Sequence, residues 1–248
     1  MSDVANAATI CFDATGTLIE AVVPVGDVYH RVARDYGVDL PAWRLDDAFR
    51  RVLRHAPARG LEGATQAERA AREIEWWFER IRQTFQAADS TARFEDFEGF
   101  AQALFDHYQR AVAWRPRMGI LQALTELTDL GSFLAVTSNF DHRLPDILEA
   151  LDLSRFFSMI EIPSQHGRAK PDRAIFKAVA EASGRAVASL VYVGDDPPEI
   201  LAAIAAHGLH VVNIRSVQES ADLTDLLFRA SNSDVPATLP SKTPVIDS

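Results

Sequence analysis

The sequence predicts an α/β protein: a Rossmann-like, doubly wound parallel sheet with an all-helical cap domain inserted into it. Three observations lead to this fold class. Short apolar runs that end in polar residues or glycine recur along the chain, helical patterns separate the last four of these runs, and residues 25–107 carry helical patterns alone. The composition, 48% hydrophobic and 24% charged, supplies enough apolar material for a sizeable core.

The five apolar runs are typical of buried parallel strands, because they are continuous rather than alternating. They cover residues 9–12, 133–137, 159–162, 190–193 and 209–212. Helical patterns over residues 141–151, 172–182 and 199–207 connect the later runs. Since parallel strands end at one edge of a sheet, we expect the polar residues that follow them to meet there.

Residues 25–107 interrupt this alternation and predict a helical insertion after the first strand. Residues 25–36 and 41–55 are each predicted to be one helix, and the run from Thr65 to Glu68 is a candidate capping box for another. The helix that follows carries apolar side chains at helical spacing: Ile74, Trp77, Phe78 and Ile81. We interpret them as core of the cap rather than as a substrate pocket.

The predicted division is a core of residues 1–22 and 111–230, a cap of residues 23–110 and a tail. The tail, residues 231–248, is rich in Ser, Pro, Asp and Thr and is expected to be disordered.

Charge and composition restrict the partners and the compartment. A net charge of −10 argues against nucleic acid or an anionic membrane as the main partner. The chain has no pattern of a signal peptide and no apolar run long enough to span a bilayer. The single cysteine, Cys11, has no internal disulfide partner, and we expect a small buried hydrophobe rather than a reactive thiol. These observations predict a cytoplasmic protein, as a monomer or homodimer.

Chemically useful side chains follow four of the predicted elements. Asp13 ends the first strand and precedes Thr15, Gly16 and Thr17; three further sets are Ser138-Asn139, Lys170-Pro171-Asp172 and Gly194-Asp195-Asp196. Each set alone is an ordinary cap or turn. Together they bring a carboxylate, a hydroxyl, an ammonium group and an acidic pair to one edge of a sheet.

That combination suits phosphoryl transfer. Asp13 could act as a nucleophile and form an aspartyl-phosphate. A divalent cation held by Asp13 and Asp195 could reduce the repulsion between the attacking Asp13 carboxylate and the anionic phosphoryl group. Ser138 and Lys170 could hold the phosphoryl oxygens.

The four sets, in this order, resemble the motifs of the haloacid dehalogenase-like superfamily. The matching segments are residues 12–18 (FDATGTL), 136–139 (VTSN), 170–172 (KPD) and 193–196 (VGDD). The resemblance implies Mg²⁺-dependent hydrolysis of a small, anionic phosphate monoester. It also implies a metal ligand in the main-chain carbonyl of Thr15, a substrate loop that includes Thr15, Gly16, Thr17 and Asn139, and a cap after the first motif.

Two positions depart from the family pattern. Thr15 stands where phosphatases of this family usually carry an Asp that protonates the leaving group, and losing such a group typically costs about 10²–10⁴-fold in rate. The family also commonly has an Asp four or five residues after Asp195, where this chain has Glu199 and Ile200. Glu199 could be a metal ligand, as could Asp196, or it could complement the helix dipole.

Three interpretations follow, in order of preference. The first is a metal-dependent phosphatase with weak or substrate-assisted chemistry. The second is a 2-haloacid dehalogenase-type enzyme, because a halide leaving group needs no proton; the acidic pair at Asp195 and Asp196 argues against this metal-free chemistry. The third is a non-enzymatic module that binds a phosphorylated ligand, which Thr15 and Ile200 favour.

Two further groups have ordinary explanations. Cationic side chains gather in one cap region, and we favour a solvated helix face over a substrate site for them: Arg44, Arg51, Arg54, His55 and Arg59. His142 is expected to be a surface residue in the first turn of a helix rather than a catalytic base.

Overall fold

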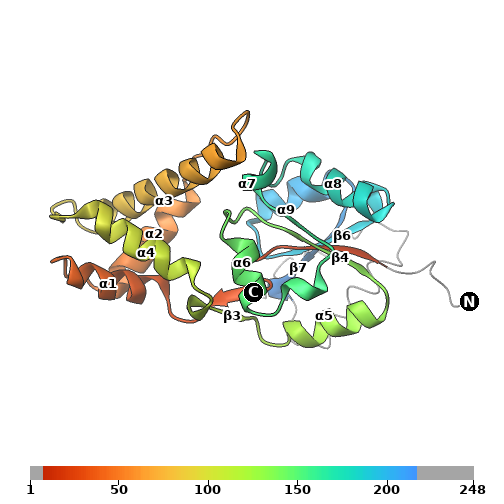
Figure 1. The fold of residues 1–248 in the computed structure, drawn as a ribbon, viewed down its shortest axis with the longest axis horizontal. Helices are drawn as coiled ribbons and strands as arrows, with labels where there is room; N and C mark the ends of the chain where they lie inside the picture. Colours follow the sequence, from red (N-terminus) through yellow and green to blue (C-terminus); the bar gives the residue numbers. More distant parts are fainter. Residues whose placement is uncertain (1–7, 217–248) are drawn as a thin grey trace, which may run out of the picture.

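The computed structural model describes residues 8–216 and contains a five-stranded parallel sheet in the order β5-β4-β1-β6-β7 (Figure 1). The strands are β1 Thr9–Phe12, β4 Phe133–Thr137, β5 Met159–Glu161, β6 Leu190–Gly194 and β7 His210–Asn213. The central strand β1 pairs in parallel with β4 on one side and with β6 on the other. The predicted α/β fold class is therefore confirmed.

Alternate residues of the strands face two separate helical layers, as the pleat requires. Ile10 and Phe12 pack in the cluster that contains α5 (Ile120–Asp129) and α6 (Leu144–Ala150). The intervening Cys11 packs on the other face, against α8 (Arg173–Ser183) and α9 (Pro198–Ala205). Cys11 is fully buried, and burial raises the pKa of its thiol, which agrees with the expected hydrophobic role.

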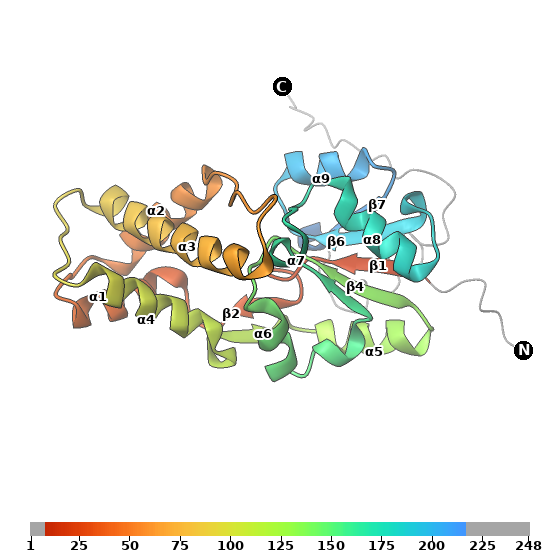
Figure 2. The same ribbon diagram turned by 45° about the horizontal axis from the view of Figure 1, so that its top comes forward.

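Four helices form the insertion and have a core of their own (Figures 1 and 2). They are α1 Val25–Asp35, α2 Ala42–Arg54, α3 Gln66–Ala88 and α4 Phe97–Gln109. Stacked and edge-on aromatic pairs join Phe85, Phe94 and Phe100 at its centre. The predicted capping box at the start of α3 is confirmed, since Thr65 and Glu68 cap one another reciprocally.

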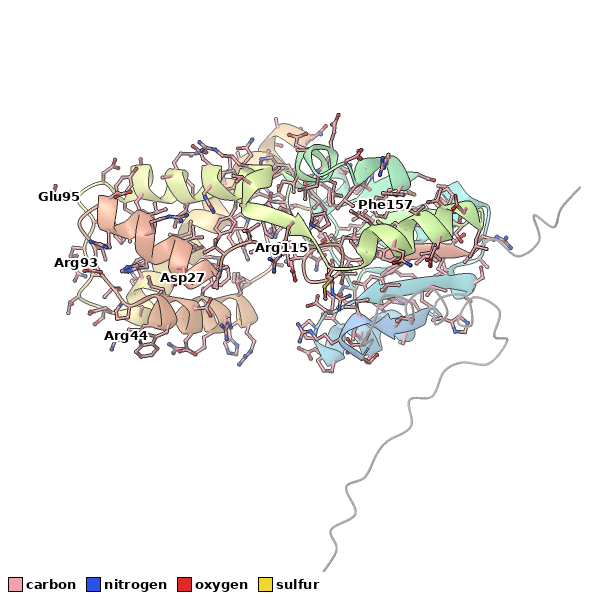
Figure 3. The ribbon with its side chains drawn as sticks, turned by 90° about the horizontal axis from the view of Figure 1, so that it is seen from below. Asp27, Arg44, Arg93, Glu95, Arg115 and Phe157 are labelled. Carbon is pink, nitrogen blue, oxygen red and sulfur yellow. The ribbon has the colours of Figure 1, made fainter. Side chains whose placement is uncertain are left out.

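A short antiparallel ribbon joins the cap to the core, and the sequence patterns do not predict it. Its strands are β2 (Ile19–Ala21) and β3 (Trp114–Pro116). Figure 3 shows Arg115 of this ribbon at the junction of the two parts, where its Nε lies 2.8 Å from Glu20 Oε1. Three residues per strand are too few to produce a clear alternation.

The remaining elements are short. They are α7 (Pro163–His166) and 3₁₀ turns at Ala111–Ala113, Ser154–Phe156, Val187–Ser189 and Ile214–Ser216.

Several expectations lie outside the described residues. The last part of the predicted core, residues 217–230, and the predicted disordered tail, residues 231–248, both fall there. Over residues 8–216 no helix combines the length and apolarity needed to cross a membrane. The cytoplasmic location and the monomeric or dimeric state stay predictions.

Candidate active site

Asp13 lies at the carboxyl end of β1, in the middle of the sheet edge. Its backbone N–H donates to the Val193 carbonyl at 2.8 Å, so the chain stays fixed to β6 at the point where the strand ends. The chain then turns at Gly16, which has a positive φ of 79°. A Cβ at Gly16 would collide with the carboxylate of Asp195. Glycine thus allows the loop after Asp13 to approach the acidic residue that follows β6.

Lys170 is the cation of the site, and its side chain is 1% exposed. Its Nζ lies 2.9 Å from Asp13 Oδ1 and 3.0 Å from Asp196 Oδ2. Burial raises the pKa of the Asp13 carboxyl, and the charge and hydrogen bond of Lys170 oppose that rise. The ammonium group is therefore positioned to stabilise negative charge at Asp13.

The segment after β4 supplies a hydroxyl and a backbone clamp. Ser138 is 3% exposed, and its Oγ accepts the N–H of Phe140 at 3.2 Å. The Asn139 side chain donates from Nδ2 to the Lys170 carbonyl at 3.0 Å and accepts the Lys170 N–H at 2.7 Å. This two-point contact fixes the backbone of the third motif, whose Lys170–Pro171 peptide is cis. Asn139 therefore positions Lys170.

Tyr192 is a member of this site that the sequence patterns did not single out. It is fully buried in β6, and its hydroxyl accepts from Lys170 Nζ and donates to Asp196 Oδ2. A Cβ at Gly194 would lie 2.6 Å from this hydroxyl, so the glycine leaves room for the phenol. The sequence feature that could have identified Tyr192 is its hydroxyl group, in a strand whose other side chains are aliphatic.

The two aspartates after β6 have different partners. Asp195 Oδ2 lies 2.8 Å from Nη2 of Arg215, whose side chain is 71% exposed. Asp196 is tied to Lys170 and Tyr192 instead. Glu199 is exposed in the first turn of α9, where a carboxylate complements the helix dipole. Its role as a metal ligand stays a prediction.

The oxygen donors around Gly16 fit a magnesium ion. Asp13, the Thr15 carbonyl and Asp195 are hard oxygen donors of the kind that Mg²⁺ prefers, and the missing Cβ of Gly16 lets the loop after Asp13 pass close to the Asp195 carboxylate. No group of three or more His, Cys, Asp or Glu side chains with metal-site geometry occurs within residues 8–216. Mg²⁺ is usually bound through one or two carboxylates, with waters and substrate phosphate as further ligands, so this sparse set is adequate.

A cavity of about 400 Å³ opens above these residues, between the sheet edge and the cap. Polar groups line its core end: Asp13, Thr15, Ser138, Asn139, Lys170 and Asp196. Cap residues with apolar or aromatic side chains line the rest: Val25, Tyr29, Phe49, Leu53, Trp76, Trp77, Ile81, Leu104, Phe105 and Tyr108. Ala21 and Trp114 of the ribbon and Phe140 of the segment after β4 complete the apolar wall. Two further residues of the predicted substrate loop, Gly16 and Thr17, do not line it, and Thr17 is fully buried.

The structure corrects one expectation about α3. Trp77, interpreted as cap core, lines the cavity, whereas Ile81 belongs to the cap core as expected and also reaches the cavity wall. Helical spacing identifies a buried face but does not distinguish a packed core from a cavity wall.

The cationic group of the cap divides in two. Four members are exposed, as expected for a solvated helix face: Arg44, Arg51, Arg54 and His55. Figure 3 shows Arg44 toward the end of the cap that lies away from the core. Arg59 differs, because its side chain is 14% exposed and lines the cavity.

Arg59 belongs to a group of contacts that joins cap to core. Its Nη1 donates to the Phe140 carbonyl at 3.2 Å and lies 3.4 Å from Oε1 of the fully buried Glu73. Glu73 Oε2 accepts the His142 N–H at 3.0 Å and lies 2.8 Å from His142 Nδ1. His142 is thus partly at the surface, with a side chain that is 32% exposed, but it precedes α6 rather than lying in its first turn, and it contacts α3 of the cap.

The loop before α6 completes these contacts. Trp77 Nε1 donates to Asp141 Oδ2 at 2.7 Å, and Arg143 Nη1 donates to the Phe105 carbonyl of α4 at 3.0 Å. Asp141 also accepts from Arg143 at 2.6–2.8 Å. The predicted helix begins at Leu144 rather than at residue 141, because Asp141 and Arg143 hold this turn and face the cap.

Comparisons with known proteins agree with this architecture. A family model described as haloacid dehalogenase-like hydrolase matches residues 7–207. A haloacid dehalogenase-like hydrolase domain-containing protein 3 of Xenopus laevis is 29% identical over 202 residues, which cover 81% of each chain. A phosphoglycolate phosphatase of Agrobacterium fabrum is 29% identical over 126 residues, 50% of this chain and 54% of that protein.

A solved L-2-haloacid dehalogenase resembles the fold with a TM-score of 0.68 and 16% identity, over 90% of this chain and 99% of that one. The family model covers most of the chain, including all four motifs around the site. The protein therefore belongs to the haloacid dehalogenase-like hydrolase family.

Proposed function

We propose that this hydrolase is a Mg²⁺-dependent phosphatase that acts on a small phosphate monoester through an aspartyl-phosphate at Asp13. One observation carries the proposal: Asp13, 8% exposed at the floor of the cavity, lies 2.9 Å from the buried Lys170 ammonium group. Ser138 lies on the same sheet edge and lines the same cavity. A nucleophilic carboxylate thus adjoins the cation and the hydroxyl that suit a phosphoryl group.

In the first step a carboxylate oxygen of Asp13 attacks phosphorus, and the bond from phosphorus to the ester oxygen breaks. Lys170 and Ser138 hold the negative oxygens during this transfer. The leaving oxygen takes its proton from water, because Thr15 has no acidic group to give. A Mg²⁺ ion held by Asp13, the Thr15 carbonyl and Asp195, with Asp196 or Glu199 as further candidates, would neutralise charge on the phosphoryl group.

In the second step water attacks the phosphorus of the aspartyl-phosphate. The bond from phosphorus to Asp13 breaks, inorganic phosphate leaves, and the carboxylate is restored. Asn139 acts through Lys170, because its side chain holds the Lys170 backbone at 2.7 and 3.0 Å.

A 2-haloacid dehalogenase-type reaction is the second candidate. Thr15 favours it, since halide leaves without a proton, and the fold resembles that of a solved L-2-haloacid dehalogenase. The acidic residue Asp195 beside Gly16 favours the phosphatase, because an ester mechanism without metal has no use for this carboxylate. The relative from Agrobacterium fabrum, a phosphoglycolate phosphatase, also supports the phosphatase.

Phosphate release from a panel of esters tests the proposal. We expect slow Mg²⁺-dependent hydrolysis of 4-nitrophenyl phosphate, loss of activity in Asp13→Asn, and retention of activity in the exposed control Asp129→Asn. Chloride release from 2-chloropropionate without metal would establish the dehalogenase instead. Absence of phosphate release above the Asp13→Asn background would reject the phosphatase, and a ligand-induced thermal shift without release of phosphate or chloride would indicate the binding module.

A further inference from the structure

We infer that the substrate is an aryl phosphate, the phosphate ester of an aromatic hydroxyl, whose ring occupies the cap end of the cavity. The inference rests on the proposed function and specifies its substrate class. Three features of the site carry it: the shape and lining of the cavity, the pairing of its cations, and the lack of a proton donor for the leaving oxygen.

The lining of the cavity fits a flat apolar body. Aromatic rings form much of the wall, among them Phe49, Trp76, Trp77 and Phe105 of the cap and Trp114 of the ribbon. Such rings pack well against another ring, face to edge or offset. A volume of about 400 Å³ lies within the usual range for small-molecule sites, and a two-carbon acid would leave most of it unfilled.

The cations in the wall of the cavity argue against a second anionic group on the substrate. Arg143 is paired with Asp141 through Nε and Nη2 and donates to a carbonyl through Nη1. Arg59 lies beside the buried carboxylate of Glu73 and over the ring of Trp76, with 5.0 Å between its Cζ and the ring centroid. Both guanidinium groups are therefore already paired with groups of the protein, and neither is free to bind a carboxylate of the substrate.

The acid–base groups of the site select the leaving group. Among the described residues that line the cavity, the carboxyl groups are Asp13 and Asp196, and both lie within 3.0 Å of Lys170 Nζ. Thr15 also lines the cavity and offers a hydroxyl only. A phenol has a pKa near 10, and an aliphatic alcohol is a far weaker acid. An aryl oxide therefore leaves unprotonated far more readily than an alkoxide.

Kinetics with matched esters test the substrate class. We expect kcat/KM for phenyl phosphate to exceed that for cyclohexyl phosphate by at least about 10²-fold, because a general acid typically contributes at least this factor to the rate and the alkyl ester needs one. We expect 1-naphthyl phosphate, whose leaving group has a similar acidity to phenol, to exceed phenyl phosphate by about tenfold, because the cavity accepts a second ring. Equal rates for phenyl and cyclohexyl phosphate would overturn the inference.

A variant that fills the cavity separates ring recognition from leaving-group chemistry. Leu53→Trp places a larger side chain in the cavity wall from the half-buried face of α2, and its exposed neighbour Arg54→Trp is the matched control. We expect the naphthyl-over-phenyl preference to disappear in Leu53→Trp and to persist in Arg54→Trp. Persistence of the preference in Leu53→Trp would contradict the proposed position of the ring.

A binding measurement gives a readout that does not depend on turnover. Three of the four tryptophans line the cavity, while Trp43 is 72% exposed elsewhere. We expect phenylphosphonate to quench tryptophan emission in the parent and in Arg54→Trp, and cyclohexylphosphonate to quench it at least about tenfold less at equal concentration.

The outcomes separate this inference from the proposed function. Hydrolysis of alkyl and aryl esters at similar rates, without quenching, leaves a phosphatase but rejects the aryl substrate. Quenching without hydrolysis of any ester above the Asp13→Asn background rejects both the phosphatase and the aryl phosphate as its substrate, and leaves a cavity that binds rings.

Discussion

At the scale of single residues, Thr15 leaves the candidate site with a hydroxyl two residues after Asp13 in place of an acidic group. Its backbone lies in the same loop as Asp13, and its side chain is exposed at the core end of the cavity. The hydroxyl of Thr15 is too weak an acid to protonate a leaving alkoxide near neutral pH. In the proposed reaction, position 15 would therefore restrict substrates through their leaving groups, while Lys170 and Ser138 would still hold the phosphoryl oxygens.

Restoring the carboxyl group should widen the substrate range. We expect Thr15→Asp to raise kcat on an alkyl phosphate by about 10²-fold or more and on 4-nitrophenyl phosphate by much less, because only the alkyl ester needs a proton donor. Thr15→Asn, with similar size and no acidic proton, is the control. Equal gains on both esters in steady-state assays would contradict this role for position 15.

Sequence alone could predict the main members of the site but not all their contacts. Asp13 and Ser138 directly follow parallel strands that end at one sheet edge, and Lys170 lies in the segment that follows β5 and α7, so topology brings the three together. Tyr192 was missed, because its position in a buried strand indicates packing and says nothing of where its hydroxyl lies. The pairing of Asp196 with Lys170 was equally inaccessible, since it depends on the final course of a loop.

At the scale of elements, the sequence predicts the limits of the parallel strands closely and the start of α6 less closely. Apolar runs predicted β1 and β4 with the observed limits. The helical pattern over residues 141–151 includes the turn before α6, which begins at Leu144. Contacts with the cap, absent from any local pattern, determine that this turn is not helical.

The Asp141 turn should make folding stability depend on pH. Burial would raise the pKa of Asp141, but hydrogen bonds and charge from Arg143, with the charge of Arg59, outweigh burial and hold that pKa below its ordinary value. A depressed pKa means that ionised Asp141 stabilises the fold above the unfolded-state pKa, near 3.9, and loses this effect as pH falls through the lower folded-state value.

Urea unfolding of Asp141→Asn tests this contribution. At pH 7 we expect the free energy of unfolding to fall by about 3–5 kcal/mol, because Arg143 keeps a buried charge without its counter-ion. The difference from the parent should shrink as pH decreases below about 3.9. The exposed control Asp146→Asn should change stability by only about 0.5 kcal/mol. A pH-independent difference for Asp141→Asn would reject the electrostatic explanation.

At the scale of the whole molecule, the site requires both parts of the chain. The core supplies the polar groups of the candidate site, the cap supplies much of the cavity wall, and the ribbon of β2 and β3 connects them. Figure 2 shows α3 extending from the cap to the core beside α7, where Arg69 donates to the carbonyls of Ser164 and Gln165. The sequence predicted a cap but not its placement, because that depends on contacts between residues far apart in the chain.

Glu73 is the central residue of this placement, because one buried carboxylate joins Arg59 of the cap to His142 of the core. We expect Glu73→Gln to release the cap and increase the radius of gyration in small-angle X-ray scattering, with the helical circular dichroism signal retained. The exposed control Glu75→Gln on the same helix should scatter like the parent. Release should also weaken quenching by phenylphosphonate, since the cap carries most of the aromatic wall. If Glu73→Gln keeps the parent radius and the parent quenching, other contacts hold the cap closed, and the carboxylate is not what unites the two halves of the site.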